Sequence, residues 1–373
     1  MKALSAGKVA LLALSAPALL LGLPLIGVLA SGHPLGRYLE FPPRTLYVAH
    51  AGFSWPVFAA LGVLIMATVL PFLLRFLAVR APRAPETPLA RRRFPWWGWA
   101  GIAGGAAAWV LAWTRFPWFQ PLQPFTFSPL WLAYILAMNA LAFQRTGRCL
   151  LTHRRPFLLA LFPVSAAFWW FFEYLNRFVQ NWAYEGVGNL TGAQYVLFAT
   201  LPFSTVLPAV LSTMEWLKSF SRVEGAWSHG TRVRIGRPGI PAGAVLLAAS
   251  AGLAGIALYP DQLFPLLWVA PLGVLASLLW FGSGRCGLEP LASGDWRPVA
   301  IPALAALLCG FFWEMWNFHS LAKWIYQVPY VQRYPIFEMP LLGYAGYLPF
   351  GLECALLGMI VDEAMRKREK TPS

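Results

Sequence analysis

Residues 156–176 read PFLLALFPVSAAFWWFFEYLN, a stretch in which Glu173 is the single charged side chain. A helix needs about 20 mainly apolar residues to cross a bilayer core that is roughly 30 Å thick. The stretch therefore predicts a membrane-spanning helix that carries one acid near its end.

The whole chain has the same character. Its 373 residues are 58% hydrophobic and only 12% charged, whereas soluble domains carry about 25% charged residues. The apolar stretches show none of the short-strand alternation of a membrane barrel. The predicted fold class is an all-α integral membrane protein with about ten transmembrane helices.

Two apolar segments, 9–30 and 51–79, come first, and a connector with five Arg and three Pro follows at 80–93. The first segment is longer than the core of a secretory signal, which is about 7–15 residues. An uncleaved first helix is therefore expected, with a cleaved signal as the alternative.

The rest of the chain repeats itself in order. The offset between matching residues stays between 284 − 147 = 137 and 324 − 182 = 142. The matches are Gly147-Arg148-Cys149 with Gly284-Arg285-Cys286, Glu173-x-x-Asn176 with Glu314-x-x-Asn317, Trp182-x-Tyr184 with Trp324-x-Tyr326, Trp131 with Trp268, and Pro202 and Glu215 with Pro340 and Glu353. So many ordered matches predict a tandem duplication.

Each copy contains four apolar segments, so both copies enter the membrane from the same side and form parallel repeats. The expected spans are 97–115, 128–144, 157–176 and 196–217 in the first copy and 241–258, 264–282, 299–317 and 339–361 in the second. The predicted domains are 1–93 with two helices and the basic connector, 94–237 with the first repeat, and 238–373 with the second repeat and a basic cytoplasmic tail.

Lys and Arg residues orient these spans, because cytoplasmic segments of membrane proteins are enriched in them. With both termini in the cytoplasm, 23 of the 29 basic residues are cytoplasmic, and the other side keeps Arg37, Arg44, Arg115, Arg177, Lys323 and Arg333. The chain is expected in the cytoplasmic membrane with the lipid bilayer as its partner. The net charge of +14 is then a topology signal, and no nucleic acid is expected.

Five acids lie in or beside apolar spans: Glu173, Glu215, Glu314, Glu338 and Glu353. A charge at the bilayer centre costs about 2.5–3.5 kcal/mol on insertion scales, so such residues usually have a partner, a proton or a ligand. The alternative is that they lie near span ends and reach interfacial water.

Residues three apart share one helix face, so Glu314 and Asn317 point the same way, as do Glu173 and Asn176. We expect the amide to hold the carboxyl in place. The alternative is a polar pair that ties two helices together.

The second copy contains an acid that the first copy lacks. Counted from the shared prolines, Glu338 corresponds to Thr200, which makes Glu338 an extra acid. We predict that the second copy is the active half and that Glu353 and a group of aromatic residues contact the substrate. These aromatics are Trp313, Trp316, Trp324, Tyr326 and Tyr344, and their π faces suit a carbocation. The alternative for them is an interfacial aromatic belt.

The run Trp313-Glu314, Trp324-x-Tyr326 and Pro335-Ile336-Phe337-Glu338 resembles the small membrane-bound lycopene cyclases of bacteria and fungi. That family has an acid in an aromatic helix, then a Trp-x-aromatic pair, then a Pro-x-Glu-Glu-like motif. The match covers about fifty residues, and Met339 replaces the second Glu of the last motif. The resemblance implies acid-initiated, non-redox chemistry on a polyprenoid, with Glu338 as the proton donor and Glu314 as the supporting acid.

The leading hypothesis is therefore an enzyme that acts on a polyprenoid or another apolar lipid. The five His show no metal or haem spacing, so neither a metal nor another cofactor is expected. Two rival classes remain: a proton-coupled transporter or channel built from the two repeats, and a structural or assembly subunit.

Overall fold

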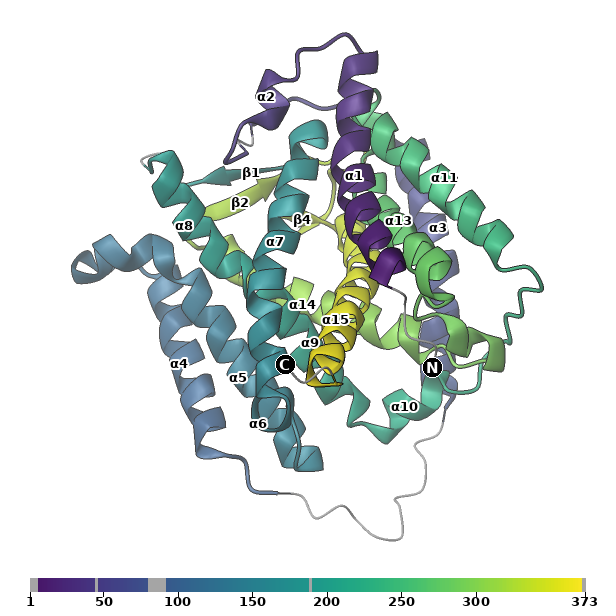
Figure 1. The fold of residues 1–373 in the computed structure, drawn as a ribbon. Coiled ribbons are helices and arrows are strands. Elements are labelled where there is room, and N and C mark those ends of the chain that lie inside the picture. Colours follow the sequence, from purple (N-terminus) through teal and green to yellow (C-terminus); the bar gives the residue numbers. More distant parts are fainter. Residues whose placement is uncertain (1–5, 44–45, 80–91, 188–189, 371–373) are drawn as a thin grey trace.

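The computed structural model describes residues 6–43, 46–79, 92–187 and 190–370. Within these ranges the chain is a bundle of helices with two small two-stranded sheets near one end (Figure 1). The predicted all-α class is confirmed at this level. Most of the basic connector, residues 80–91, lies outside the described residues.

The main helices follow the expected apolar segments. They are α1 (Ala6–Ala30), α3 (Trp55–Ala78), α4 (Trp96–Trp113), α5 (Phe127–Thr146), α7 (Arg155–Val179), α8 (Gly192–Phe203), α9 (Val206–Lys218), α11 (Gly239–Gly255), α13 (Leu266–Ser283), α14 (Arg297–Phe318) and α15 (Tyr347–Lys370).

Seven stretches within the described ranges are long and apolar enough to cross a membrane. They are Trp55–Ala78, Phe127–Thr146, Arg155–Val179, Gly192–Lys218, Leu266–Ser283, Arg297–Phe318 and Leu341–Lys367. The apolar parts of α1 and α11, Leu14–Ala30 and Gly239–Gly255, are shorter.

Short elements connect these helices. They are α2 (Gly36–Leu39), η1 (Pro117–Phe125), α6 (Leu150–His153), β1 (Trp182–Glu185), α10 (Ser221–Trp227), α12 (Pro260–Leu263), η2 (Glu289–Ser293), β2 (Lys323–Tyr326), β3 (Pro335–Ile336), β4 (Met339–Pro340) and η3 (Leu341–Gly346).

The two Gly-Arg-Cys motifs end helices. Gly147 follows α5 at φ 73° and Gly284 follows α13 at φ 71°, and glycine adopts this left-handed conformation without steric cost. After each glycine, the backbone N–H of Arg148 or Arg285 donates to the hydroxyl of Thr146 or Ser283. The motif is therefore a matched helix-ending turn.

The helices pack in matching pairs. α4 lies on α5 as α11 lies on α13, and α9 packs on α5 and α7 as α15 packs on α13 and α14. The two groups meet where α9 contacts α14 and where α15 contacts α7 and α9. α1 covers α11 and α13, and α3 packs beside α10.

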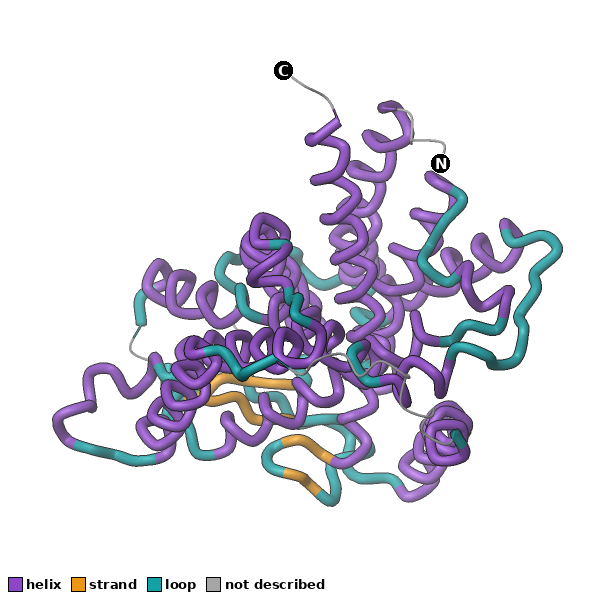
Figure 2. Tube along the Cα trace, turned by 90° about the horizontal axis from the view of Figure 1, so that it is seen from below, coloured by secondary structure: helices purple, strands orange, loops and turns teal. Residues whose placement is uncertain are grey.

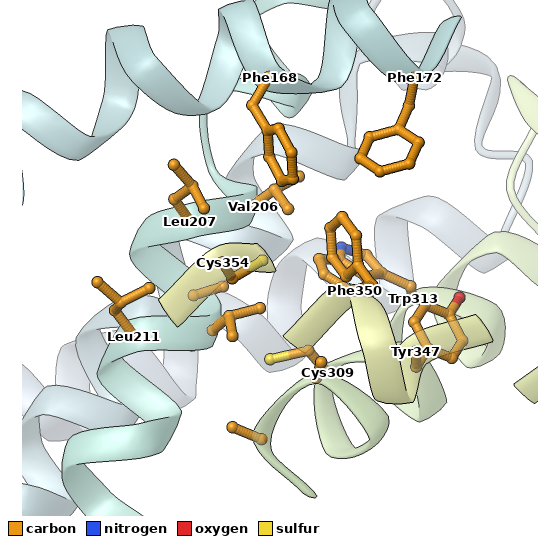
Figure 3. Close-up of a cluster of buried hydrophobic side chains, with 14 of the residues drawn as sticks. Phe168, Phe172, Val206, Leu207, Leu211, Cys309, Trp313, Tyr347, Phe350 and Cys354 are labelled. Carbon is orange, nitrogen blue, oxygen red and sulfur yellow. The ribbon is translucent and has the colours of Figure 1, made fainter. Parts of the chain in front are cut away.

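Aromatic side chains fill the centre of this contact (Figure 3). Phe350 of α15 is fully buried and stacks on Phe168 of α7, with ring centroids 5.6 Å apart. The backbone of α15 also lies close to α14, because a Cβ added at Gly351 would stand 2.2 Å from the carbonyl oxygen of Pro302. The glycine permits this close helix contact.

β1 and β2 form an antiparallel ribbon at one end of the bundle, whereas α6 and α10 lie towards the other end (Figure 1). The ribbon pairs Trp182 with Tyr326 and Tyr184 with Trp324. Successive strand residues point to opposite faces, so these four aromatics share one face. β4 adjoins β2, and Figure 2 shows both small sheets in orange on the same side.

The register of the ribbon can be tested by crosslinking. Ala183 lies opposite Ile325, where Cβ atoms are typically about 4.5–5.5 Å apart, close to the range that a disulfide spans. In a background without the four native cysteines, Ala183→Cys with Ile325→Cys should crosslink under mild oxidation, as measured by peptide mass spectrometry.

The pair Glu185→Cys with Ile325→Cys is the matched control, because it is displaced by two residues along the strand. It should crosslink much less. A stronger crosslink in this control pair would show that the register is shifted.

Candidate functional site

An aromatic cleft opens beside the ribbon, with about 1030 Å³ of empty space when the open solvent at its mouth is included. Its wall combines side chains from α7, α8, α13, α14, α15 and both ribbon strands. The main contributors are Trp169, Trp182, Tyr184, Tyr195, Phe203, Trp268, Trp313, Trp324, Tyr326 and Tyr347. Such a wall suits a large apolar molecule.

Glu173 lies behind one wall of the cleft, on α7, and is completely buried. Its Oε1 accepts hydrogen bonds from Trp169 Nε1 at 3.1 Å, Trp182 Nε1 at 3.1 Å and the Tyr184 hydroxyl at 2.6 Å. Its Oε2 is buried and has no hydrogen-bond partner among the described residues. All three donors line the cleft.

Glu314 lies behind another wall, on α14, and is also completely buried. Its Oε1 accepts hydrogen bonds from the hydroxyls of Tyr326 at 2.8 Å and Tyr347 at 2.7 Å. Its Oε2, too, lacks a partner within the described part of the chain. The sequence predicted an important acid at this position, and the structure places it one hydroxyl away from the cleft.

Phenol groups therefore stand between each carboxyl and the cleft. Burial raises the pKa of Tyr326 well above its usual value, and the nearby Glu314 raises it further. Burial and Glu173 act in the same way on the pKa of Tyr184. Both hydroxyls keep their protons at physiological pH and remain hydrogen-bond donors to the carboxyls.

The two asparagines bind backbone groups instead of the carboxyls. Asn317 donates from Nδ2 to the carbonyl of Trp324 at 2.7 Å and accepts at Oδ1 from the N–H of the same residue at 2.9 Å. Asn176 donates to the carbonyl of Trp182 at 2.8 Å. The asparagines bind backbone because each helix ends within a few residues of them. The strand that follows, β1 after α7 and β2 after α14, brings backbone groups that need hydrogen-bond partners.

Glu338 is placed differently from the apolar setting that the sequence suggested. β3 pairs Ile336 with Met339, so Glu338 stands in the two-residue turn of a hairpin. There its Oε1 accepts from Lys323 Nζ at 2.6 Å, and 22% of its side chain is exposed. It does not line the cleft. The turn exposes the carboxyl, and β2 supplies the cation.

The remaining aromatic candidates divide between the cleft and its surroundings. Trp313, Trp324 and Tyr326 line the cleft. Trp316 instead packs against Trp131 with ring centroids 5.2 Å apart, and Tyr344 donates its hydroxyl to the carbonyl of Ile336 at 3.0 Å.

Two further acids lie away from the cleft. Glu353 is completely buried in α15, where no described side chain binds its carboxyl and the backbone of Leu272 in α13 approaches it. Glu215, its sequence counterpart, accepts from Lys218 at 3.0 Å near the exposed end of α9. These two matched acids therefore have opposite environments.

Several cleft residues were not singled out as site residues from the sequence. Trp169 stands four residues before Glu173, and this spacing places both on one helix face, which is a usable signal. Tyr195 and Phe203 of α8 reach the cleft through tertiary packing, and no local pattern marks them.

No three His, Cys, Asp or Glu side chains gather to hold a metal ion within the described ranges. Comparison with protein families, with curated proteins and with solved structures found no match to this chain. The site is therefore interpreted from its own geometry.

The two hydrogen bonds between Asn317 and the backbone of Trp324 support a stability prediction. Asn317→Ala leaves two partly buried backbone groups of Trp324 without partners, at about 1–3 kcal/mol each. The free energy of unfolding in detergent should therefore be about 2–4 kcal/mol lower than that of the wild type. Gln262→Ala is the control, because Gln262 makes one exposed bond of 3.3 Å to Tyr330, and its loss should cost under about 0.5 kcal/mol. Equal losses in both variants would contradict the structural role of Asn317.

Proposed function

We propose that this protein is a membrane-embedded enzyme that binds a polyprenoid or another long apolar lipid and modifies it by acid-initiated, non-redox chemistry. The observation that carries the proposal is the position of Glu314, one phenol hydroxyl away from an aromatic cleft. Carboxyl groups in apolar surroundings are suited to hold and deliver a proton.

The reaction begins with the transfer of a proton to a double bond. The reacting form has a protonated Glu314 whose O–H points at the Tyr347 oxygen, the reverse of the hydrogen bond that Tyr347 donates to Glu314 in the structure. The Tyr347 hydroxyl then gives its proton to one alkene carbon while the proton of Glu314 moves to the Tyr347 oxygen. The π electrons of the double bond form the new C–H bond and leave a carbocation beside the glutamate carboxylate. Loss of a proton from the carbocation, or addition of water and loss of a proton, restores the acid.

The cleft wall supports such an intermediate. Trp313 stacks on Tyr347 with ring centroids 5.8 Å apart, and Trp324 and Trp182 line the same cleft. The faces of aromatic rings attract cations most strongly where water is excluded. The aromatic residues thus bind the apolar chain and stabilise its positive charge.

Glu314 is preferred over Glu173 because of the groups that contact it. Two tyrosine hydroxyls donate to Glu314, and hydroxyls donate and accept hydrogen bonds and can pass a proton on. Two of the three donors to Glu173 are tryptophan N–H groups, which only donate. Glu314 therefore has two proton routes to the cleft and Glu173 has one.

The resemblance to membrane-bound lycopene cyclases agrees with this chemistry but not with the position of its donor. By the motif, the donor is Glu338, which forms an ion pair with Lys323 and does not line the cleft. The geometry favours Glu314, so we assign the donor role to Glu314 and a role in fixing the hairpin to Glu338.

The tandem duplication is part of the proposal, and two pairs of contacts support it. The ribbon joins the repeated Trp-x-Tyr motifs to each other in antiparallel register, as a two-fold axis between two copies requires. Trp131 contacts Trp313, with centroids 4.8 Å apart, and the matched residues Trp268 and Phe172 are 5.1 Å apart. Two parallel repeats after two leading helices give ten spans.

The placement in the cytoplasmic membrane, with both termini inside, is likewise part of the proposal. Lys323 and Arg177 lie near the ribbon, whereas Arg145, Arg154, Lys218 and Arg222 belong to the end with α6 and α10. The positive-inside rule places the second end in the cytoplasm. The aromatic cleft then faces the outer leaflet.

A proton-coupled transporter is the second candidate, because a second cavity lies at the opposite end. It has an empty volume of about 620 Å³ up to its mouth and is lined by Arg154, Glu215, Lys218 and Asp362 together with apolar residues of α7, α9 and α15. We call it the inner cavity. Hollows at both ends of a two-repeat bundle are what alternating access requires.

The lipid content of cells that express the protein tests the proposed enzymatic activity. A host that makes linear polyprenoids should contain a new isomer or hydrate of a polyprenoid when it expresses the wild type, as measured by mass spectrometry and chromatography. Glu314→Gln should reduce this product at least about a hundredfold, because the proton source is lost. Tyr347→Phe should also reduce it.

Glu338→Gln and Glu215→Gln are the matched controls and should keep most of the product. If wild-type extracts equal those of the empty host, the enzyme proposal fails and solute flux becomes the next assay. A product that disappears with Glu338→Gln and persists with Glu314→Gln would return the donor role to Glu338.

A further inference from the structure

The inner cavity is a groove between α9 and α15 that the proposed cleft chemistry does not use. Its deeper part is apolar and includes Leu211 of α9 and Gly358 of α15. The helices touch there, because a Cβ added at Gly358 would stand 2.6 Å from Cδ2 of Leu211. Arg154 and Phe157 at the start of α7 line a third side, with the guanidinium carbon 4.1 Å from the centre of the phenylalanine ring.

Two carboxyl groups face this groove from the two helices, and both helices run away from the ribbon end. Glu215 follows Leu211 by four residues, and Asp362 follows Gly358 by four. Each acid therefore lies on the same helix face as the contact and about 6 Å farther along the axis. Both line the cavity, and 43% of the Glu215 side chain and 24% of the Asp362 side chain are exposed. A ligand in the groove can reach both acids.

Two cations stand beside these acids. Arg154 forms an ion pair with Asp362, and Lys218 pairs with Glu215 at 3.0 Å. Arg366 also pairs with Asp362, at 2.9 Å, but does not line the cavity. The lining thus holds two positive and two negative groups around one shared space.

The helix packing itself does not require these charges. At the offset that matches Glu215 with Glu353, Lys218 matches Leu356. Both Glu353 and Leu356 are buried, so the corresponding stretch of α15 packs without an exposed ion pair. The charged lining belongs to one side of the bundle only, and a ligand would account for it.

A ligand with both signs of charge complements this lining. A simple anion on Arg154 and Lys218 would also meet two carboxylates, and a simple cation between the carboxylates would meet two basic groups, and like charges repel. A zwitterion gives every lining charge an opposite partner. Guanidinium and ammonium groups bind phosphate oxygens, and carboxylates accept hydrogen bonds from the N–H groups of a primary ammonium.

The bilayer supplies such a zwitterion. The positive-inside rule places this end of the bundle at the cytoplasmic surface, so the headgroups of that leaflet are its nearest ligands. Lys218 lies about one helical turn nearer the end of α9 than Glu215 does. A headgroup that enters with its ammonium first therefore meets the carboxylates with the ammonium and the basic groups with the phosphate, and its acyl chains stay outside the groove.

We propose that the inner cavity binds the headgroup of phosphatidylethanolamine, with the ammonium between Glu215 and Asp362 and the phosphate on Arg154 and Lys218. The bound lipid links α9 to α15, and so joins the two groups of helices at the end opposite the cleft. This site is separate from Glu314 and does not depend on the enzymatic activity.

Thermal unfolding in nanodiscs tests the headgroup. The discs consist of phosphatidylcholine alone or with an equal added fraction of phosphatidylethanolamine or phosphatidylglycerol, all with the same acyl chains. Phosphatidylethanolamine should raise the melting temperature by several degrees, because a ligand of the folded state stabilises it. Phosphatidylglycerol, which lacks the ammonium, should have little effect. The double variant Glu215→Gln with Asp362→Asn should lose most of the shift.

Glu338→Gln is the matched control, because it breaks the ion pair with Lys323 at the ribbon end and leaves the inner cavity intact. It should keep the full shift. An equal shift in the wild type and the double variant would overturn the proposal. A shift with soluble phosphoethanolamine that the lipid does not reproduce would overturn the assignment to a lipid.

Native mass spectrometry gives a second readout on folded protein, so a loss of stability in a variant does not affect it. The wild type should retain phosphatidylethanolamine several-fold more than phosphatidylcholine or phosphatidylglycerol, and Glu215→Gln with Asp362→Asn should retain the three lipids about equally. Arg154→Gln with Lys218→Gln should weaken retention of all three, because they share the phosphate. Equal retention of the three lipids by the wild type would contradict the proposal.

Discussion

The structure depends on the burial of two carboxyl groups that have no ion-pair partner in the part of the chain that the structure describes. Glu173 and Glu314 are both completely buried, and each is held at one oxygen by aromatic donors. Most of these donors come from the ribbon of β1 and β2. This ribbon also joins the segment that follows α7 to the segment that follows α14. Because a buried polar group must be satisfied, the ribbon, the helix ends and the aromatic wall of the cleft are fixed together.

This constraint explains why Glu173, Glu314, Asn176 and Asn317 lie at the same end of the bundle as the ribbon. Each asparagine ties the returning strand to its helix, and each strand then presents a tryptophan and a tyrosine to one face. The same arrangement that gives each carboxyl hydrogen bonds at one oxygen places phenol hydroxyls between the acids and the aromatic cleft. The aromatic residues that hold the two buried carboxyls are therefore also the residues that line the cleft.

Much of the fold could be predicted from the sequence, because apolar stretches of about 20 residues have few alternatives. Glu173 and Glu314 were also predictable, since an acid in an apolar span is rare and needs a reason. Glu338 was not, because its environment depends on a hairpin turn and on Lys323, fifteen residues earlier. Trp316 and Tyr344 matched the aromatic pattern, but whether they reach the cleft depends on tertiary packing.

The proposed function requires an apolar chain to lie in the aromatic cleft against Tyr326 and Tyr347, whose hydroxyls donate to Glu314. A polyprenol that carries a photoreactive diazirine along its chain tests this directly in purified protein, with the labelled peptides identified by mass spectrometry. The account predicts label on Trp313, Trp324 or Tyr347, and a loss of that label when an excess of unlabelled polyprenol is added. Label confined to the lipid-facing surface of α3, unaffected by competitor, would contradict it.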